Sequence, residues 1–236
     1  MKYKRILLKL SGESLAGSSG QGLDADVLSS YAKEIKEVCA SGIQVAIVVG
    51  GGNIFRGLSG VGKGFDRVKG DQMGMLATTI NSIALGCALQ GEGIDAVVFS
   101  ATPMEPIARY WERDRASALL DQGTVVLVSG GTGNPFFTTD TAAALRAVEL
   151  GVGALFKGTR VDGVFSADPE KDPQAVKFDR LSFDQALEKN LQVMDMTAFT
   201  LCRENKMPVV VFNMNKKGNL LRVVKGESIG TELQSI

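Results

Sequence analysis

The chain has 236 residues, of which 44% are hydrophobic and 22% are charged, a balance typical of a soluble globular protein. Lys plus Arg equal Asp plus Glu, so the net charge is zero and the composition lacks the basic excess of a nucleic-acid-binding protein. Histidine is absent, which excludes Ser-His-Asp triads, Cys-His pairs and HExxH zinc sites. Any chemistry must therefore use Lys, Asp, Arg, backbone amides and metal ions.

The cysteines and the start of the chain indicate a compartment. Cys39, Cys87 and Cys202 form no CxxC pair, so neither a disulfide framework nor a zinc site is expected. The apolar stretch after Met1–Arg5 is short and is broken by Lys9, unlike a signal peptide. No apolar run approaches the ~18 residues of a membrane span. We expect a cytoplasmic protein with no membrane or nucleic-acid partner.

Short apolar runs alternate with helical patterns along the chain. The runs are continuous and aliphatic, as in strands that are buried on both faces of a parallel sheet. They predict six strands, at Arg5–Leu10, Gln44–Val49, Ala96–Ser100, Thr124–Ser129, Ala154–Lys157 and Pro208–Asn213.

The segments between these runs have helical periodicity or helix-capping residues. They predict six helices, at Asp26–Ala40, Gln72–Gln90, Arg113–Asp121, Thr141–Leu150, Phe183–Lys189 and Thr197–Asn205. The helix Gln72–Gln90 is unusually apolar, which places it in the core or at a subunit interface. Residues 158–180 break the pattern and predict a hairpin around Asp162-Gly163. The alternation predicts one α/β domain over residues 1–236, a three-layer αβα sandwich with a central, mainly parallel sheet.

Three of the predicted strands end in glycine-rich loops. These loops are Lys9–Glu13, Gly50–Asn53 and Gly130–Asn134. Parallel strands bring their carboxyl ends to one edge of the sheet, and glycine lets a phosphate approach backbone N–H groups. One such loop is usually only a turn, but three at one edge indicate a phosphate site. Lys9 would carry positive charge to that edge, as phosphoryl transfer requires.

The stretch Thr132–Asp140 is the most informative of the chain. Thr138 and Thr139 precede a predicted helix, where hydroxyls and free N–H groups hold anions. An N-cap with a hydrophobic staple explains the threonines, but it explains the adjacent Phe136 and Phe137 less well. The near-match to a P-loop at 57–64 lacks the final Ser or Thr that holds magnesium, and no GxGxxG motif is present.

Taken together, these motifs resemble the bacterial uridylate kinases of the amino-acid-kinase fold, over nearly the whole chain. The most specific part is the combination of Gly70-Asp71-x-Met-Gly-Met with the stretch 132–140. The other matching motifs are Lys9–Glu13, Gly50–Asn53 with Arg56, Val161–Phe165, Met194-Asp195 and Phe212–Asn215.

The resemblance implies an activity and its partners. It implies that ATP and UMP give ADP and UDP with Mg²⁺, in pyrimidine nucleotide biosynthesis, with feedback inhibition by UTP and a homohexameric assembly. It also implies that residues of about 1–150 form the acceptor half and those of about 151–236 the ATP-nucleoside half.

The resemblance also assigns residues by motif, although it gives none as a direct metal ligand. Positions matching the ATP site are Lys9, Leu10, Ser11, Gly12, Gly52, Arg56, Thr159, Phe165 and Asp168. Positions matching the UMP site are Gly51, Asp71 (on the ribose), Thr132, Gly133, Asn134, Pro135, Phe136, Phe137, Thr138 and Thr139. Catalytic roles fall on Lys9 and Lys157, with Asp140 and Asp195 orienting lysines or magnesium.

Simpler interpretations of several positions stay open. Asp162-Gly163 and Asp168-Pro169 are also turn sequences, Asp195 also suits a helix cap near Thr197, and Lys157 also suits a strand-end charge. Two other functions remain as well. One is a kinase of the same superfamily that acts on a carboxylate or carbamate, and the other is a nucleotide-binding protein without catalysis.

One departure from the family pattern concerns regulation. Many uridylate kinases are activated by GTP through arginines around the long apolar helix and the strands that follow it. Here Ile80–Thr102 contains no Lys or Arg, and Thr124 stands where a basic residue is expected, although the glycine-rich loop Gly17–Gly22 is retained. A triphosphate would lack charge partners there, so we expect weak or absent GTP activation.

Overall fold

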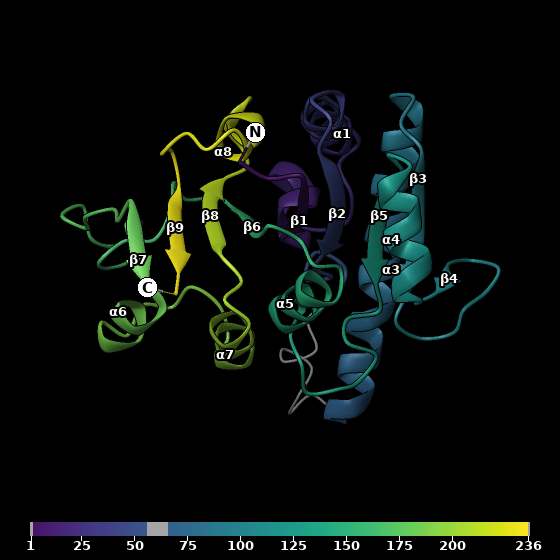
Figure 1. Ribbon diagram of the computed structural model, residues 1–236. Helices are drawn as coiled ribbons and strands as arrows, with labels where there is room; N and C mark the ends of the chain where they lie inside the picture. The colour runs from purple at the N-terminus through teal and green to yellow at the C-terminus, as the bar shows by residue number, and fades with distance from the viewer. Residues whose placement is uncertain (1, 56–65, 236) are drawn as a thin grey trace.

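The computed structural model describes residues 2–55 and 66–235. In this part of the chain nine strands form one sheet, in the order β4-β3-β5-β2-β1-β6-β8-β9-β7 (Figure 1). All neighbouring strands are parallel except β8 and β9, which confirms a mainly parallel sheet. The strands are β1 Arg5–Leu10, β2 Gln44–Val49, β3 Ala96–Ser100, β4 Arg109–Tyr110, β5 Val125–Ser129, β6 Ala154–Thr159, β7 Arg180–Ser182, β8 Val209–Asn213 and β9 Thr231–Gln234.

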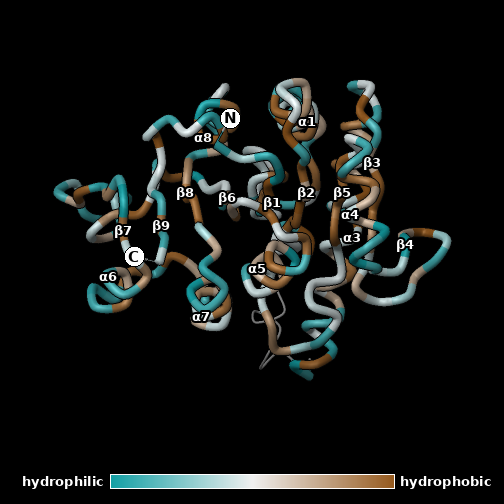
Figure 2. The backbone as a smooth tube through the Cα atoms, viewed as in Figure 1, coloured by the Kyte–Doolittle hydropathy of each residue, from teal (hydrophilic) through white to brown (hydrophobic). Residues whose placement is uncertain are grey.

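Helices cover both faces of the sheet and complete the three layers. One apolar cluster joins α1, α3 and α8 to one face, and a second joins α4, α5, α6 and α7 to the other. Figure 2 shows the hydrophobic colour concentrated along the central strands that these two clusters share. The helices are α1 Ala25–Ala40, α3 Arg67–Gly91, α4 Arg113–Asp121, α5 Thr139–Glu149, α6 Phe183–Glu188, α7 Met196–Glu204 and α8 Asn219–Val224, with a 3₁₀ segment η1 at Gly12–Ser19.

The alternation of side chains along β1 brings a lysine to the functional edge. Leu8 and Leu10 pack toward α1, while Leu7 packs into the opposite cluster. Because side chains alternate between the faces of a strand, Lys9 emerges on the face of Leu7. It is in register with Lys157 of β6, so the two ammonium groups start from adjacent strands.

The predicted strands and helices are all present, but their bounds and number needed correction. The helix expected from Gln72 begins five positions earlier, at Arg67, where Asp66 caps it by accepting from Lys69 N. The predicted hairpin around Asp162-Gly163 is wrong, because β6 continues to Thr159 and pairs with β8. Periodicity also missed the short elements, which are β4, β7, β9, η1 and α8.

Helix α3 also corrects the statement about membrane spans. With 25 residues and a mean hydropathy of 1.2 over its most apolar window, it is long and apolar enough to cross a bilayer. In the structure Leu85 and Leu89 of this helix are fully buried in the cluster shared with α1 and the sheet. Leu76 and Ile80 are about half exposed, so α3 is both a core helix and an apolar surface.

Candidate active site

A carboxylate bridges two lysines at the carboxyl ends of the central strands. Asp140, in the first turn of α5, places Oδ1 2.7 Å from Lys9 Nζ and Oδ2 2.6 Å from Lys157 Nζ. Lys157 Nζ also donates to the carbonyl of Val193, at 2.6 Å. Each of the three charged side chains is only 13–15% exposed. The centre therefore holds two ammonium groups in fixed positions, and the three side chains together carry a net charge of +1.

The pKa values within this centre follow from burial and from the three charges. Burial raises the pKa of Asp140, but Lys9 and Lys157 outweigh it and hold that pKa below its ordinary value. Burial also lowers the pKa of Lys157, and the charge of Lys9 adds to the effect, while Asp140 opposes it. Asp140 is thus an anion at neutral pH, and Lys157 is easier to deprotonate than an ordinary lysine.

The first two glycine-rich loops touch each other through their backbones. A Cβ on Gly12 would lie 2.4 Å from the carbonyl oxygen of Gly50, so only glycine fits there. Gly50 N donates to Leu10 O at 2.9 Å, which continues the β1–β2 pairing into the loops. In the third loop, Gly130 has φ of 76° and its Cβ position lies 2.9 Å from Ala101 N. Close backbone packing explains these glycines before any ligand is considered.

A cavity of about 470 Å³ lies between the second and third loops and the start of α3. It is rimmed by glycines and hydroxyls, and its charged members are Glu13, Arg67 and Asp71. Of the positions expected at the UMP site, those that line it are Gly51, Asp71, Thr132, Asn134, Phe137, Thr138 and Thr139, and they are joined by Gly52 from the expected ATP set.

Asp71 ties two walls of this cavity together. Its Oδ2 accepts from Arg67 Nε at 2.8 Å, one helical turn earlier, and from Phe136 N at 2.8 Å. Phe136 has φ of 72°, is 63% exposed, and has its ring 5.6 Å from the Arg67 guanidinium. The aspartate thus holds the loop of Phe136 against α3, and no described residue donates to Asp71 Oδ1.

A second aspartate, Asp195, connects the N-terminus of α5 to α7 by hydrogen bonds. Asp195 accepts from Ala198 N at 3.1 Å and so caps α7. Its carboxylate also accepts from the Thr138 hydroxyl, and from Thr141 Oγ1 at 3.0 Å. Thr138 in turn caps α5 by accepting from Thr141 N at 3.1 Å. The helix-cap interpretation of Asp195 is therefore correct, and the cap also fixes one wall of the cavity.

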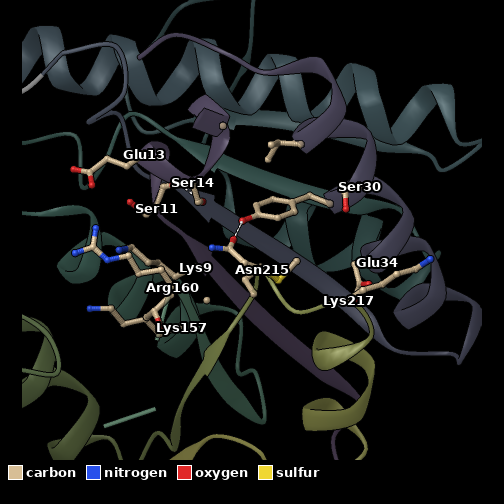
Figure 3. Close-up of a pocket in the computed structure, with 16 residues that line it drawn as sticks. Lys9, Ser11, Glu13, Ser14, Ser30, Glu34, Lys157, Arg160, Asn215 and Lys217 are labelled. Atoms are coloured by element: carbon tan, nitrogen blue, oxygen red, sulfur yellow. Dashed lines mark hydrogen bonds between the residues drawn. The ribbon is translucent and has the colours of Figure 1, made fainter. Parts of the chain in front are cut away.

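Two further cavities open at the same edge. One, of about 520 Å³, is lined by the expected ATP-nucleoside residues Thr159, Phe165 and Asp168. The other, of about 700 Å³, contains Lys9, Ser11 and Lys157 (Figure 3). It shares Lys157, Thr159 and Arg160 with the 520 Å³ cavity and Glu13 with the 470 Å³ cavity. Lys9 and Lys157 therefore line the 700 Å³ cavity, which borders both of the others, and Thr138 and Thr139, next to Asp140 in sequence, line the 470 Å³ cavity.

The remaining expected residues are placed as follows. Leu10 is fully buried in the core, so only its backbone can face a ligand. Gly133 packs against Ala101, and neither it nor Pro135 nor Phe136 is among the described residues that line the 470 Å³ cavity. Arg56 and the near-match to a P-loop at 57–64 lie outside the described residues.

Sequence reasoning missed several cavity residues. Arg67 carried a usable signal, since it stands four residues before Asp71, the spacing of a helical ion pair. Tyr31 lies on the buried face of α1, yet its hydroxyl donates to Asn215 Oδ1 at 3.0 Å, and both residues line the 700 Å³ cavity. Nothing in the sequence distinguishes this tyrosine from its core neighbours.

Comparison with known proteins gives a consistent result. The model of the "Amino acid kinase family" matches residues 4–213. A uridylate kinase of Porphyromonas gingivalis is 58% identical over 229 residues, 97% of this chain and 96% of that protein. A uridylate kinase of Parabacteroides distasonis is 58% identical over 98% of both chains. The chain belongs to the uridylate kinases of the amino acid kinase family.

Solved structures of family members support the fold directly. The UMP kinase from Bacillus anthracis superposes with a TM-score of 0.95 at 38% identity, covering 98% of this chain and 96% of that one. The UMP kinase from Ureaplasma parvum gives 0.93 at 34% identity with full coverage of both chains. As a member of this family the chain is an enzyme, a nucleoside monophosphate kinase with the predicted α/β fold.

The described residues contain no cluster that would cage a metal. No group of three or more Cys, Asp or Glu side chains gathers in residues 2–55 and 66–235. Both oxygens of Asp140 are already engaged by lysines, and Asp195 accepts from two hydroxyls and a backbone N–H. Such a site fits a Mg²⁺ ion that is held mainly by nucleotide phosphates, as this ion commonly is in kinases.

Proposed function

We propose that this chain transfers the γ-phosphoryl group of ATP to the phosphate of UMP, giving ADP and UDP in cytoplasmic pyrimidine nucleotide biosynthesis. The supporting observation is the Lys9–Asp140–Lys157 centre, whose two lysines line the 700 Å³ cavity that borders both the 470 Å³ and the 520 Å³ cavities. The family relationship supplies the identity of the nucleotides.

UMP is assigned to the 470 Å³ cavity. Asp71 would accept from the ribose with Oδ1, while Oδ2 keeps the 132–139 loop in place. Thr139 would face the phosphate with its hydroxyl and with the N–H groups of the first turn of α5, while Thr138, whose hydroxyl is held by Asp195, would shape the wall beside it. Phe137 would cover the base, which explains a half-exposed aromatic side chain at the cavity wall.

ATP is assigned to the opposite side of the centre. Thr159, Phe165 and Asp168 would hold its nucleoside in the 520 Å³ cavity. Its phosphates would lie along Lys9 and the Ser11-Gly12 turn, with Gly52 and Arg56 between the two nucleotides. The residues lining the acceptor cavity all fall within 13–139 and those of the donor cavity within 157–211, in agreement with an acceptor half of about 1–150 and a donor half of about 151–236.

The transfer needs no general base. An oxygen of the UMP phosphate, largely a dianion near neutral pH, attacks the γ-phosphorus in line, and the bond from that phosphorus to the bridging oxygen of ADP breaks. Lys9 and Lys157 would neutralise the charge that spreads over the transferring oxygens, with Asp140 holding both in position. Mg²⁺ bound with ATP would supply further charge neutralisation.

Regulation and assembly are proposed on the family pattern. UTP carries the same uridine as UMP, so it would inhibit by competing for the acceptor cavity. A homohexamer is proposed as well, with the half-exposed Leu76 and Ile80 of α3 as a first subunit contact.

The test is the initial rate of ADP formation with MgATP and a panel of acceptors: UMP, CMP, dUMP, AMP, carbamate and acetylglutamate. Strong preference for UMP is expected. Turnover with carbamate or acetylglutamate alone would keep the fold and overturn the substrate. Binding of ATP and UMP without turnover would instead favour the non-catalytic alternative.

A further inference from the structure

Two buried asparagines lie behind the second glycine-rich loop, and the transfer scheme above gives neither of them a role. Asn53 ends that loop and is 4% exposed, while Asn81 of α3 is fully buried. Their amides face each other and bond reciprocally. Asn81 Nδ2 donates to Asn53 Oδ1 at 2.7 Å, and Asn53 Nδ2 donates to Asn81 Oδ1 at 3.1 Å.

Each amide has a second N–H bond, and it goes to a different loop. Asn81 Nδ2 donates to the carbonyl of Gly50 at 2.6 Å, and Asn53 Nδ2 donates to the carbonyl of Gly22 at 2.6 Å. All four amide hydrogens of the pair are thus used. A carboxamide is the neutral side chain that offers two donors and an acceptor at one end, so a carboxylate of the same shape cannot replace it.

The bond to Gly50 controls the direction of the next N–H group. A trans peptide is planar, with its C=O and N–H on opposite sides. When Asn81 holds the Gly50 carbonyl toward the interior, the N–H of Gly51 must point away from it. Gly51 lines the acceptor cavity, and its packing against Ala77 of α3, where a Cβ would come within 2.8 Å, limits other orientations.

We propose that Asn81 is a positioning residue for phosphoryl transfer, which fixes the Gly50–Gly51 peptide so that the phosphate loop keeps its N–H groups aimed at the transferring phosphoryl. This inference rests on the proposed function, which assigns that loop to the phosphates. Asn81 touches no substrate, and it acts through the Gly50 carbonyl. Asn53 holds the partner amide in place and secures the neighbouring Gly22.

The pair offers a matched experiment. Asn81→Asp and Asn53→Asp each put one carboxylate into the same buried pair and each remove two donated hydrogen bonds. Only N81D removes the donor to Gly50; N53D removes the donor to Gly22. Melting temperature, kcat and both KM values are measured for the two variants and for Leu89→Ala, a core truncation on the same helix. L89A serves as the control that lowers stability without changing KM.

We expect N81D and N53D to lower the melting temperature similarly, while N81D lowers kcat at least about tenfold more than N53D. Equal kcat losses in the two variants, or an N81D kcat within about twofold of wild type, would overturn the inference. Turnover of UMP by the wild type tests the proposed function separately. If the wild type uses another acceptor, the ratio of the N81D and N53D kcat values is measured with that acceptor. If the wild type shows no turnover, the MgATP affinities of the two variants are compared by calorimetry instead. Equal affinities would then overturn the inference.

Discussion

The acceptor cavity and the donor-nucleoside cavity are similar in volume but differ in how their walls are held. Around the acceptor cavity, Asp71 joins α3 to the 132–139 loop, and Asp195 joins the start of α5 to α7. The donor cavity is bordered by the 160–177 segment, where the Arg160–Glu170 ion pair is 69% and 49% exposed. Because exposed ion pairs contribute little to stability, this pair holds the wall of the donor cavity less firmly than the hydrogen bonds of Asp71 and Asp195 hold the walls of the acceptor cavity.

This difference indicates where selectivity resides. A preorganised cavity with a satisfied network discriminates by leaving polar groups unpaired when the wrong ligand binds. A cavity that is bordered by an exposed loop can rearrange around a different ligand at a lower cost in free energy. We therefore expect strict selection of the acceptor and more permissive binding of the donor nucleoside, with the lysine–aspartate centre between them common to both.

Lys9→Ala should have the largest effect, because it removes a positive charge from the place where charge develops in the transition state. Loss of one such group costs roughly 3–4 kcal/mol, so kcat should fall at least about a hundredfold. Steady-state rates against the exposed control Lys36→Ala would check this. Near-normal turnover of K9A would show that the role given to Lys9 is wrong.

Asp140→Asn should destabilise the fold by about 3 kcal/mol at pH 7, because it removes the carboxylate that is ion-paired with both buried lysines. The folded pKa of Asp140 lies below its ordinary value, so its stabilisation is present above the unfolded pKa of about 3.9 and is lost as pH falls through the folded pKa. Urea unfolding of both proteins from pH 7 down to about pH 2.5 should show the difference shrinking below about pH 3.9. A difference independent of pH would contradict the ion-pair account.

Asp71→Asn and Phe165→Ala compare the two cavities directly. D71N weakens a charged hydrogen-bond centre and should raise the KM for UMP by about tenfold to a hundredfold, with the KM for ATP nearly unchanged. F165A removes a packing contact at an exposed loop and should raise only the KM for ATP, by less than about tenfold. Comparable effects of both variants on both KM values would remove the distinction between the cavities.

GTP should have the smallest effect. With no Lys or Arg in Ile80–Thr102, a triphosphate near α3 and β3 lacks charge partners. Titration of GTP into the UMP reaction should leave the initial rate essentially unchanged. Several-fold activation would mean that another cationic surface receives the triphosphate.

The sequence predicted the parts of this fold that are set by local patterns. The continuous aliphatic runs identified the buried strands, and the caps near Thr138 and Asp195 marked two helix starts. The two-residue strand β4 and the edge strands β7 and β9 were missed, since they are short and are set by pairing rather than by periodicity. For the site, motifs identified Lys9 and Asp140 as separate candidates, but only the fold showed that Asp140 bridges both lysines. The Asn53–Asn81 pair was hidden for the same reason, because its partners are 28 residues apart.

Hydrogen–deuterium exchange with one nucleotide at a time tests the separation of the two cavities most directly. UMP alone should slow exchange at the start of α3 and in the 131–139 loop, and ATP alone should slow it in 159–170 and 189–193. That pattern would place acceptor and donor on opposite sides of the Lys9–Asp140–Lys157 centre, as the account requires. Protection of 159–170 by UMP alone would contradict it.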